Sequence, residues 1–167
     1  MKTLAPLAII LLLSFTLFSC SPEDDGIFFN GNSEVVNIST VSYSAIETEI
    51  LKLINNHRTS LGLSKLNTLT IISGVADGHT NYMIEVGTIN HDNFSKRSQT
   101  LMDQADAITV GENVAYGYST AQGVVNGWLN SASHRKIIEN PNYTHFGIST
   151  EVNTKNRNYF TQIFIKK

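Results

Sequence analysis

The single cysteine is the feature that most limits how this 167-residue chain can fold. One cysteine cannot form a disulfide within the chain, so a folded domain must be stabilised by its hydrophobic core. Cys20 directly follows an apolar run, Leu4 to Phe18, which comes after a positive start at Lys2. This layout is typical of a cleaved targeting segment, and the run is too short to span a bilayer comfortably. We expect residues 1–19 to be a signal peptide and the remainder to hold one domain at most.

The four residues Leu17-Phe18-Ser19-Cys20 resemble a bacterial lipobox, although Phe18 is bulkier than the usual residue there. The resemblance implies that Cys20 becomes the lipidated first residue of the mature protein, carrying acyl chains such as palmitate. Lipid, rather than a helix, would then attach the protein to a membrane. An ordinary cleaved signal peptide with a chance cysteine is the alternative.

Residues 20–43 begin with a polar, acidic stretch and are predicted to form a flexible tether. The acidic cluster Glu23-Asp24-Asp25 resembles the signal that directs some Gram-negative lipoproteins to the outer face of the outer membrane. We therefore expect an outer membrane lipoprotein, with exposure on the cell surface as a further hypothesis. A plain solvated linker is the alternative.

The charge of the chain excludes one class of partner. Lysines and arginines number 12 and aspartates and glutamates number 14, which gives a net charge of -2 at pH 7. Such a mildly acidic chain lacks the basic surface that a phosphate backbone attracts. We expect no nucleic-acid partner.

Two stretches near the start of the domain have helical periodicity. Ser44 and Glu47 form a capping-box pattern ahead of apolar residues at helical spacing, and Gly62 follows as a stop. A second helix is predicted over residues 70–86, with His79 on its apolar stripe. A histidine in that position is more often a hydrogen-bonded core residue than a ligand.

The rest of the chain mixes helices and strands. Ser95 is expected to cap a short helix, residues 108–115 to form a strand, Thr120 to open a helix and His134 to begin another. Residues 146–148 and 159–165 are predicted to form the two strands of a C-terminal β-hairpin. We predict an α/β fold, a three-layer α/β/α sandwich. Its core should include the bulky aromatic residues Trp128, Phe146 and Phe164.

The stretch Gly111-Glu112-Asn113-Val114-Ala115 contains the most informative carboxylate. His91 precedes it in a predicted loop and His134 follows it, each too distant in sequence to meet Glu112 locally. If the fold brings the three together, two imidazoles and a carboxylate match the ligand set of an open catalytic zinc site. Structural roles in a turn and at a helix start are the alternatives.

Four motifs occur in order between Ile46 and Phe164: G-E-N-V-A, V-V-x-x-W-x-x-S-x-x-H-R, H-F-G-I and T-Q-I-F. In this order they resemble the CAP superfamily of cysteine-rich secretory, antigen 5 and pathogenesis-related proteins, in its bacterial, cysteine-poor branch. The resemblance implies a three-layer sandwich over residues 44–167. It also implies a cleft lined by two histidines and acidic partners, which in several members binds zinc or another divalent cation.

Carried over by this resemblance, His91, Glu112 and His134 match three of four site positions. The fourth is an acid in animal members, three residues after the tryptophan, and is Ser131 here. Ser131 can form hydrogen bonds but cannot act as a base at neutral pH. Arg135, which follows His134, is expected either to pair with an acid or to recognise a carboxylate in the cleft.

Three functions remain open, and whether the protein is an enzyme is uncertain. The leading hypothesis is a membrane-anchored extracytoplasmic domain that binds a small-molecule, lipid or peptide ligand with a divalent metal, zinc foremost and calcium or magnesium as alternatives. A metal-assisted hydrolase of peptides or envelope polymers, with Glu112 as proton acceptor, is the second. A surface interaction module with an inert pocket is the third. The sequence contains no Gly-x-Ser-x-Gly elbow, so serine hydrolysis is not favoured.

Overall fold

The computed structural model describes residues 42–167, so the predicted signal peptide, Cys20 and nearly all of the predicted tether lie outside the described residues. Within this range no helix is long and apolar enough to cross a membrane. The helices are α1 (Ala45–Ser60), α2 (Thr70–Val86), α3 (Phe94–Ala105), α4 (Ala121–Asn130) and α5 (Ala132–Ile138), and the strands are β1 (Asn67–Thr68), β2 (Thr109–Tyr116), β3 (His145–Val152) and β4 (Asn158–Lys166).

Local signals set both ends of α1. The Ser44 side chain accepts a hydrogen bond from the Glu47 backbone, and the Glu47 carboxylate accepts one from the Ser44 backbone at 2.8 Å, which completes the predicted capping box. At the other end Gly62 has a φ of 75°, and the amides of Gly62 and Leu63 return to carbonyls of the last turn. This is a Schellman ending, which glycine adopts without a steric penalty.

The helix α2 has the predicted bounds, and Gly87 ends it in the left-handed conformation with a φ of 74°. The predicted cap of α3 is wrong. Asn93, with a φ of 57°, occupies that position instead of Ser95. Asparagine tolerates left-handed backbone, and the Phe94 amide closes the preceding turn on the His91 carbonyl at 3.1 Å. The loop that carries His91 is therefore short and tightly turned.

The helices α4 and α5 follow one another closely. The Thr120 side chain caps α4, as predicted. The next helix, α5, begins at Ala132 rather than at His134, so His134 lies inside its first turn. Gly127 permits close packing, because a β-carbon there would overlap the ring of Tyr118.

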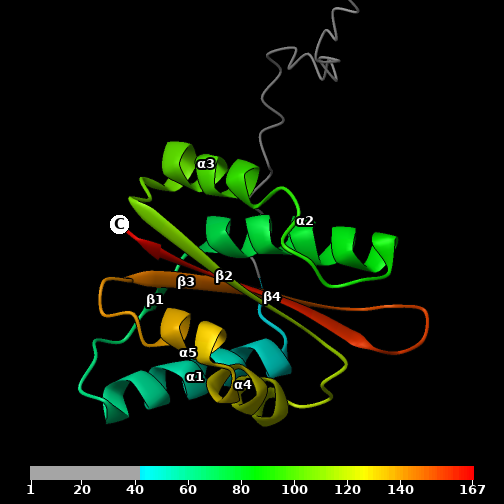
Figure 1. Ribbon diagram of the computed structural model, residues 1–167, viewed down its shortest axis with the longest axis horizontal. Helices are drawn as coiled ribbons and strands as arrows, with labels where there is room; N and C mark the ends of the chain where they lie inside the picture. Colours follow the sequence, from blue (N-terminus) through cyan, green and yellow to red (C-terminus); the bar gives the residue numbers. More distant parts are fainter. Residues whose placement is uncertain (1–41) are drawn as a thin grey trace, which may run out of the picture. The chain divides into compact units, whose positions relative to one another are not determined.

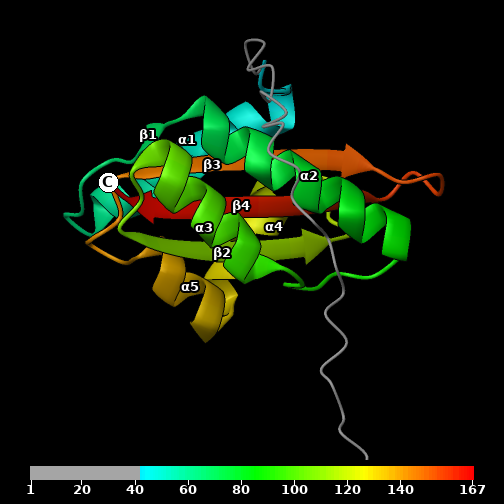
Figure 2. The same ribbon diagram turned by 90° about the horizontal axis from the view of Figure 1, so that it is seen from above.

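The strands form one four-stranded sheet in the order β1-β3-β4-β2 within the described residues. The last two strands, β3 and β4, make the predicted antiparallel hairpin, and β4 also pairs antiparallel with β2 along the whole length of β2. The helices α2 and α3 cover one face of the sheet and α1, α4 and α5 the other (Figures 1 and 2). This confirms the three-layer α/β/α prediction and leaves β2 at the edge of the sheet.

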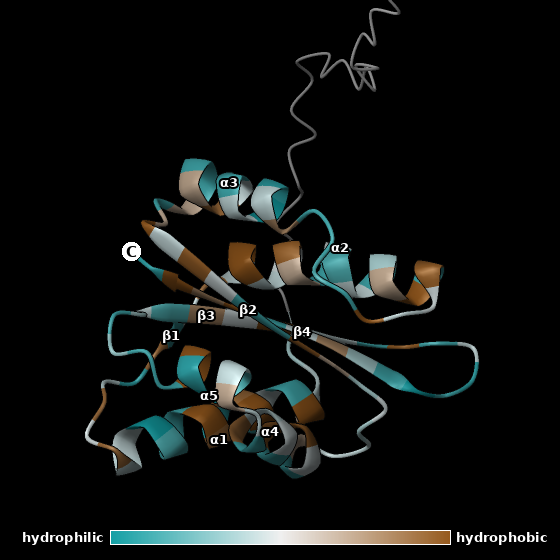
Figure 3. Ribbon diagram, viewed as in Figure 1, coloured by the Kyte–Doolittle hydropathy of each residue, from teal (hydrophilic) through white to brown (hydrophobic). Residues whose placement is uncertain are grey.

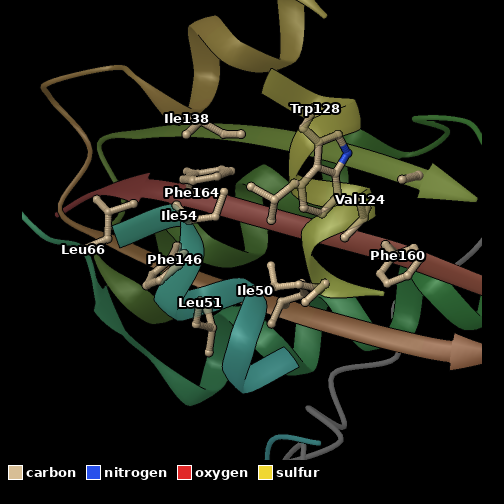
Figure 4. Packing of buried hydrophobic residues seen from close by; sticks show 14 of the residues in the cluster. Ile50, Leu51, Ile54, Leu66, Val124, Trp128, Ile138, Phe146, Phe160 and Phe164 are labelled. Atoms are coloured by element: carbon tan, nitrogen blue, oxygen red, sulfur yellow. The ribbon is translucent and has the colours of Figure 1, made fainter. Parts of the chain in front are cut away.

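The core occupies both sides of the sheet. Trp128, Phe146 and Phe164 are buried in the larger cluster, between the sheet and the layer of α1 and α4, which confirms that prediction (Figure 4). Apolar and polar segments alternate along α1 and α2, as expected for helices that bury one side (Figure 3). Each fully buried large side chain contributes about 1.5–3 kcal/mol.

Candidate functional site

Glu112 lies in the middle of β2, with its side chain turned toward the layer of α2 and α3 and only 1% exposed. A buried carboxylate requires a charged partner. Arg97 of α3 supplies it in a bidentate pair: its Nη2 donates to Oε1 at 2.7 Å and its Nε donates to Oε2 at 2.8 Å. Glu112 is therefore held rigidly as a carboxylate, with both oxygens engaged.

His91, in the loop between α2 and α3, contacts the same carboxylate. The distance from its Nδ1 to Oε1 of Glu112 is 2.8 Å, and its side chain is 51% exposed. A carboxylate can only accept, so Nδ1 carries the proton. In the neutral ring Nε2 then holds a lone pair directed away from Glu112. Two of the three predicted site residues are thus in direct contact.

His79 anchors the loop that carries His91 and lies close to Glu112. It is buried on α2, and its Nε2 lies 2.8 Å from the carbonyl of Asn90, directly before His91, and 3.8 Å from Oε1 of Glu112. Burial lowers the pKa of His79, despite opposing effects of the Asn90 hydrogen bond and the Glu112 charge. A neutral His79 donates to Asn90 and anchors the loop, in agreement with its predicted role as a hydrogen-bonded core residue.

His134 approaches from the opposite layer, on α5. It is half-buried, and burial together with the nearby His91 lowers its pKa. The side chain of Asn113 donates to the His134 backbone carbonyl at 3.2 Å, which ties α5 to β2. Among residues 42–167 no hydrogen bond joins the His134 ring to Glu112 or His91. The third predicted residue is therefore a neighbour of the pair that is not hydrogen-bonded to it.

Arg97 is the site residue that the sequence reasoning missed. It lies in the first turn of α3, where the helix dipole disfavours a positive charge. A positive charge at a helix start indicates a specific acidic partner. This was the feature of the sequence from which the role of Arg97 could have been predicted. Arg97 also donates to the Asp92 carbonyl, which braces the His91 loop from α3.

The trio His91, Glu112 and His134 does not fit a three-ligand metal site as it is arranged. Arg97 engages both oxygens of Glu112, and the described part of the chain contains no group of three or more His, Cys, Asp or Glu side chains placed to hold a metal ion. A carboxylate behind a histidine more often orients the ring than binds the metal itself. Metal binding stays a prediction.

A cleft of about 400 Å³ opens beside Glu112. Its polar groups are the Glu112 carboxylate, the His91 ring and the Tyr143 hydroxyl, and burial raises the pKa of Tyr143. Gly111 is required at the wall, because a β-carbon there would overlap the Tyr143 hydroxyl. The remaining wall is apolar, and the lining residues are His91, Phe94, Val110, Gly111, Glu112, Ile137 and Tyr143.

Two other predicted groups have structural contacts. The hydroxyls of Ser131 and Ser133 lie 3.1 Å apart, and within residues 42–167 neither hydroxyl is hydrogen-bonded to a histidine, so no serine triad is assembled. Arg135 donates to the Leu129 carbonyl at 3.1 Å, close to the end of α4. Neither of the roles predicted for Arg135 is needed to explain this position.

The fold and the motif order define a CAP-type α/β/α domain, and comparison with known proteins assigns the family. Residues 51–164 match the Cysteine-rich secretory protein family, CAP, and the chain belongs to it. Over 126 residues the chain is 39% identical to the uncharacterized membrane protein YlbC of Bacillus subtilis, covering 72% of this chain and 34% of YlbC. The chain thus spans about a third of that curated relative.

Solved structures agree with this assignment. An outer surface protein of Borrelia burgdorferi superposes with a TM-score of 0.69 at 25% identity, covering 76% of this chain and 96% of that one. An extracellular protein containing a SCP domain from Bacillus anthracis gives a TM-score of 0.62 at 27% identity, covering 72% of this chain and 40% of that one. The family thus includes extracellular and membrane-associated relatives.

Proposed function

We propose that this CAP domain binds a ligand outside the cytoplasm, in the cleft beside His91. The observation that carries the proposal is the fixed imidazole: buried Glu112 holds Nδ1 of His91 at 2.8 Å and is itself clamped by Arg97. Burying the charges of Glu112 and Arg97 costs desolvation free energy, and a purely structural loop does not need such a pair. It fixes the orientation of a ring that lines a mostly apolar cleft and leaves Nε2 as the nitrogen that Glu112 does not engage.

The chemistry of the cleft selects the kind of ligand. Arg97 pairs with the charge of Glu112, and the wall offers the His91 imidazole and the Tyr143 phenol as hydrogen-bonding groups. Apolar walls from Phe94 and Ile137 flank these groups. A ligand with a hydrogen-bond donor and an apolar portion is the best match.

The hydrolase alternative is less well supported by these contacts. It requires Glu112 to take a proton from attacking water. Both oxygens of Glu112 are already engaged by Arg97, and Oε1 also contacts His91, so neither oxygen is free to position a water molecule. The site is better arranged for binding than for proton transfer through Glu112.

A thermal-shift screen of small molecules that carry a donor group tests the binding function. The full-length protein, a His91→Ala variant and a Leu61→Ala variant are compared, since Leu61 is exposed at the end of α1 and does not line the cleft. We expect compounds that raise the melting temperature of the wild type and of Leu61→Ala but not of His91→Ala. Equal shifts in all three proteins would place binding elsewhere and reject the proposed site.

Metal binding is a separate part of the proposal, with zinc foremost and calcium or magnesium as alternatives. His91 and His134 are the candidate ligands, and Glu112 would orient His91 from behind. Calorimetric titration of the metal-stripped protein should then show binding that is lost in both His91→Ala and His134→Ala. An absence of binding in the folded wild type would leave a metal-free cleft.

A further inference from the structure

The free edge of the sheet runs along the same cleft. The strand β2 pairs with β4 on one side only, within the described residues. The helices α3 and α5 lie near this edge from opposite layers (Figure 2). An edge strand keeps backbone N–H and C=O groups that no neighbouring strand uses.

The register identifies the groups that point outward. Gly117 donates its amide to the Asn158 carbonyl at 2.8 Å, which extends the β2–β4 register by one hydrogen-bonded pair. Because antiparallel pairs alternate, every second residue of β2 directs its backbone groups to the free edge. Trp128 agrees with this assignment, since its indole donates to the Val114 carbonyl at 3.1 Å. The outward-facing residues around the cleft are Val110, Glu112 and Val114.

Two of these residues keep their outward groups unused. No partner among residues 42–167 takes the outward backbone groups of Val110 or Glu112. Both residues line the cleft, between Phe94 on one side and Ile137 on the other. The cleft therefore contains backbone donors and acceptors at strand spacing.

The edge has only one of the usual protections against strand pairing. Natural edge strands carry exposed lysines, prolines, bulges or inward-pointing charges that oppose a further strand. The sequence of β2, TVGENVAY, has neither lysine nor proline, and its one charge, Glu112, is turned inward and paired with Arg97. Apart from this paired charge, nothing in β2 itself opposes an added strand at the cleft.

We propose that the cleft binds an extended peptide, which adds as a further strand to the edge of β2 at Val110 and Glu112. This inference rests on the proposed function, because it names the ligand class of the same cleft. Side chains of an added strand alternate between the two faces of the sheet. One set would meet His91 and Phe94 and the other Ile137, so apolar side chains are favoured on both faces of the peptide.

Phage-displayed random dodecapeptides, selected against the full-length protein, supply the probe. The most enriched sequence is synthesised and its affinity measured for the wild type, Val110→Pro and Val110→Ala. Proline removes an outward amide while sparing the bonds to β4, and is tolerated on edge strands. We expect binding weakened on the order of tenfold or more by Val110→Pro. Val110→Ala keeps the amide and should retain most of the affinity.

Modified peptides test the pairing without changing the protein, so the proposal stays testable if Val110→Pro fails to fold. N-methylation at alternate peptide positions should weaken binding, and methylation at the intervening positions should not, because only every second amide faces β2. In NMR spectra the amide signals of Val110 and Glu112 should shift more than that of Gly111.

This proposal would be overturned by peptides whose affinity is unchanged by Val110→Pro and by N-methylation at any position. A selection that yields no binding peptide would overturn it as well. If small molecules still bind in a His91-dependent manner, the proposed function stands and only the peptide class is wrong. If neither probe depends on the cleft, both proposals fail.

Discussion

At the scale of single residues, one buried carboxylate organises the site. Glu112 receives Arg97 from α3 and His91 from the preceding loop, and His79 lies 3.8 Å from the same oxygen. The Glu112 carboxylate itself is buried, where an unpaired charge is costly, although the His91 side chain is half-exposed. The arrangement can therefore be tested by removing one charge at a time.

Replacing Arg97 by methionine should destabilise the protein by about 3–5 kcal/mol, because it removes the arginine that pairs with the buried charge of Glu112. The double variant Arg97→Met with Glu112→Gln should recover much of that loss. Urea unfolding followed by circular dichroism measures both. Strictly additive losses in the double variant would show that the two side chains are not coupled.

The buried histidines predict a dependence of stability on pH. Burial lowers the pKa values of His79 and His134 below their ordinary value of 6.5. The unfolded chain therefore binds protons at a higher pH than the folded chain. The stability contribution is complete above about pH 6.5 and falls as the pH decreases through the lowered pKa values. His79→Gln, which keeps a donor for Asn90, should show a shallower fall in urea midpoint, and an unchanged slope would contradict this origin.

At the scale of elements, local signals predicted boundaries and long-range contacts escaped prediction. Ser44, Gly62 and Gly87 act through their own backbone neighbours, so the bounds of α1 and α2 could be predicted from sequence. The cap of α3 could not be predicted, because Ser95 and Asn93 are both good capping residues. The geometry of the preceding turn places Asn93 at the cap position. Arg97 escaped because its partner lies on another element.

Arg58 shows how one helix positions another. It is fully buried, and its guanidinium donates to the carbonyls of Ser64, Ile138 and Asn140, which joins α1 to the end of α5. Its position in the last turn of α1 also suits a positive charge, because of the helix dipole. The long-range contacts have the larger effect, since three carbonyls accept hydrogen bonds from this side chain.

Arg58→Met should cost at least about 2 kcal/mol, because it leaves buried carbonyls without donors. The matched control is His57→Ala on the same helix, which removes a half-exposed contact with Glu139 and should cost about 1 kcal/mol or less. Chemical denaturation of both variants provides the comparison. Equal losses would mean that the Arg58 contacts add nothing to stability.

At the scale of the whole molecule, the sequence order of helices and strands predicted the three layers, since periodicity and turn signals agree along the described chain. The proximity of the three site residues could not be predicted from such local signals. His91, Glu112 and His134 come from a loop, a strand and a helix that meet only in the folded domain. Family resemblance identified them, and geometry then showed a bonded pair with His134 beside it.

Membrane attachment through Cys20 is proposed from the sequence and concerns residues outside the described range. Cys20→Ala should release the protein from the membrane fraction, because no lipid could then be attached. Detergent partitioning of wild type and variant measures this. A variant that still fractionates with membranes would contradict the anchor, and protease resistance on intact cells would contradict surface display.

The central claim is that Glu112 fixes the tautomer of His91 and leaves Nε2 as its acceptor for a ligand. Long-range proton–nitrogen NMR correlation of the imidazole signals at neutral pH tests it most directly, with the His91 signals assigned by their loss in His91→Ala. We predict that neutral His91 carries its proton on Nδ1 and that Glu112→Gln shifts the ring toward a mixture of tautomers. A wild-type His91 protonated on Nε2 would contradict the account.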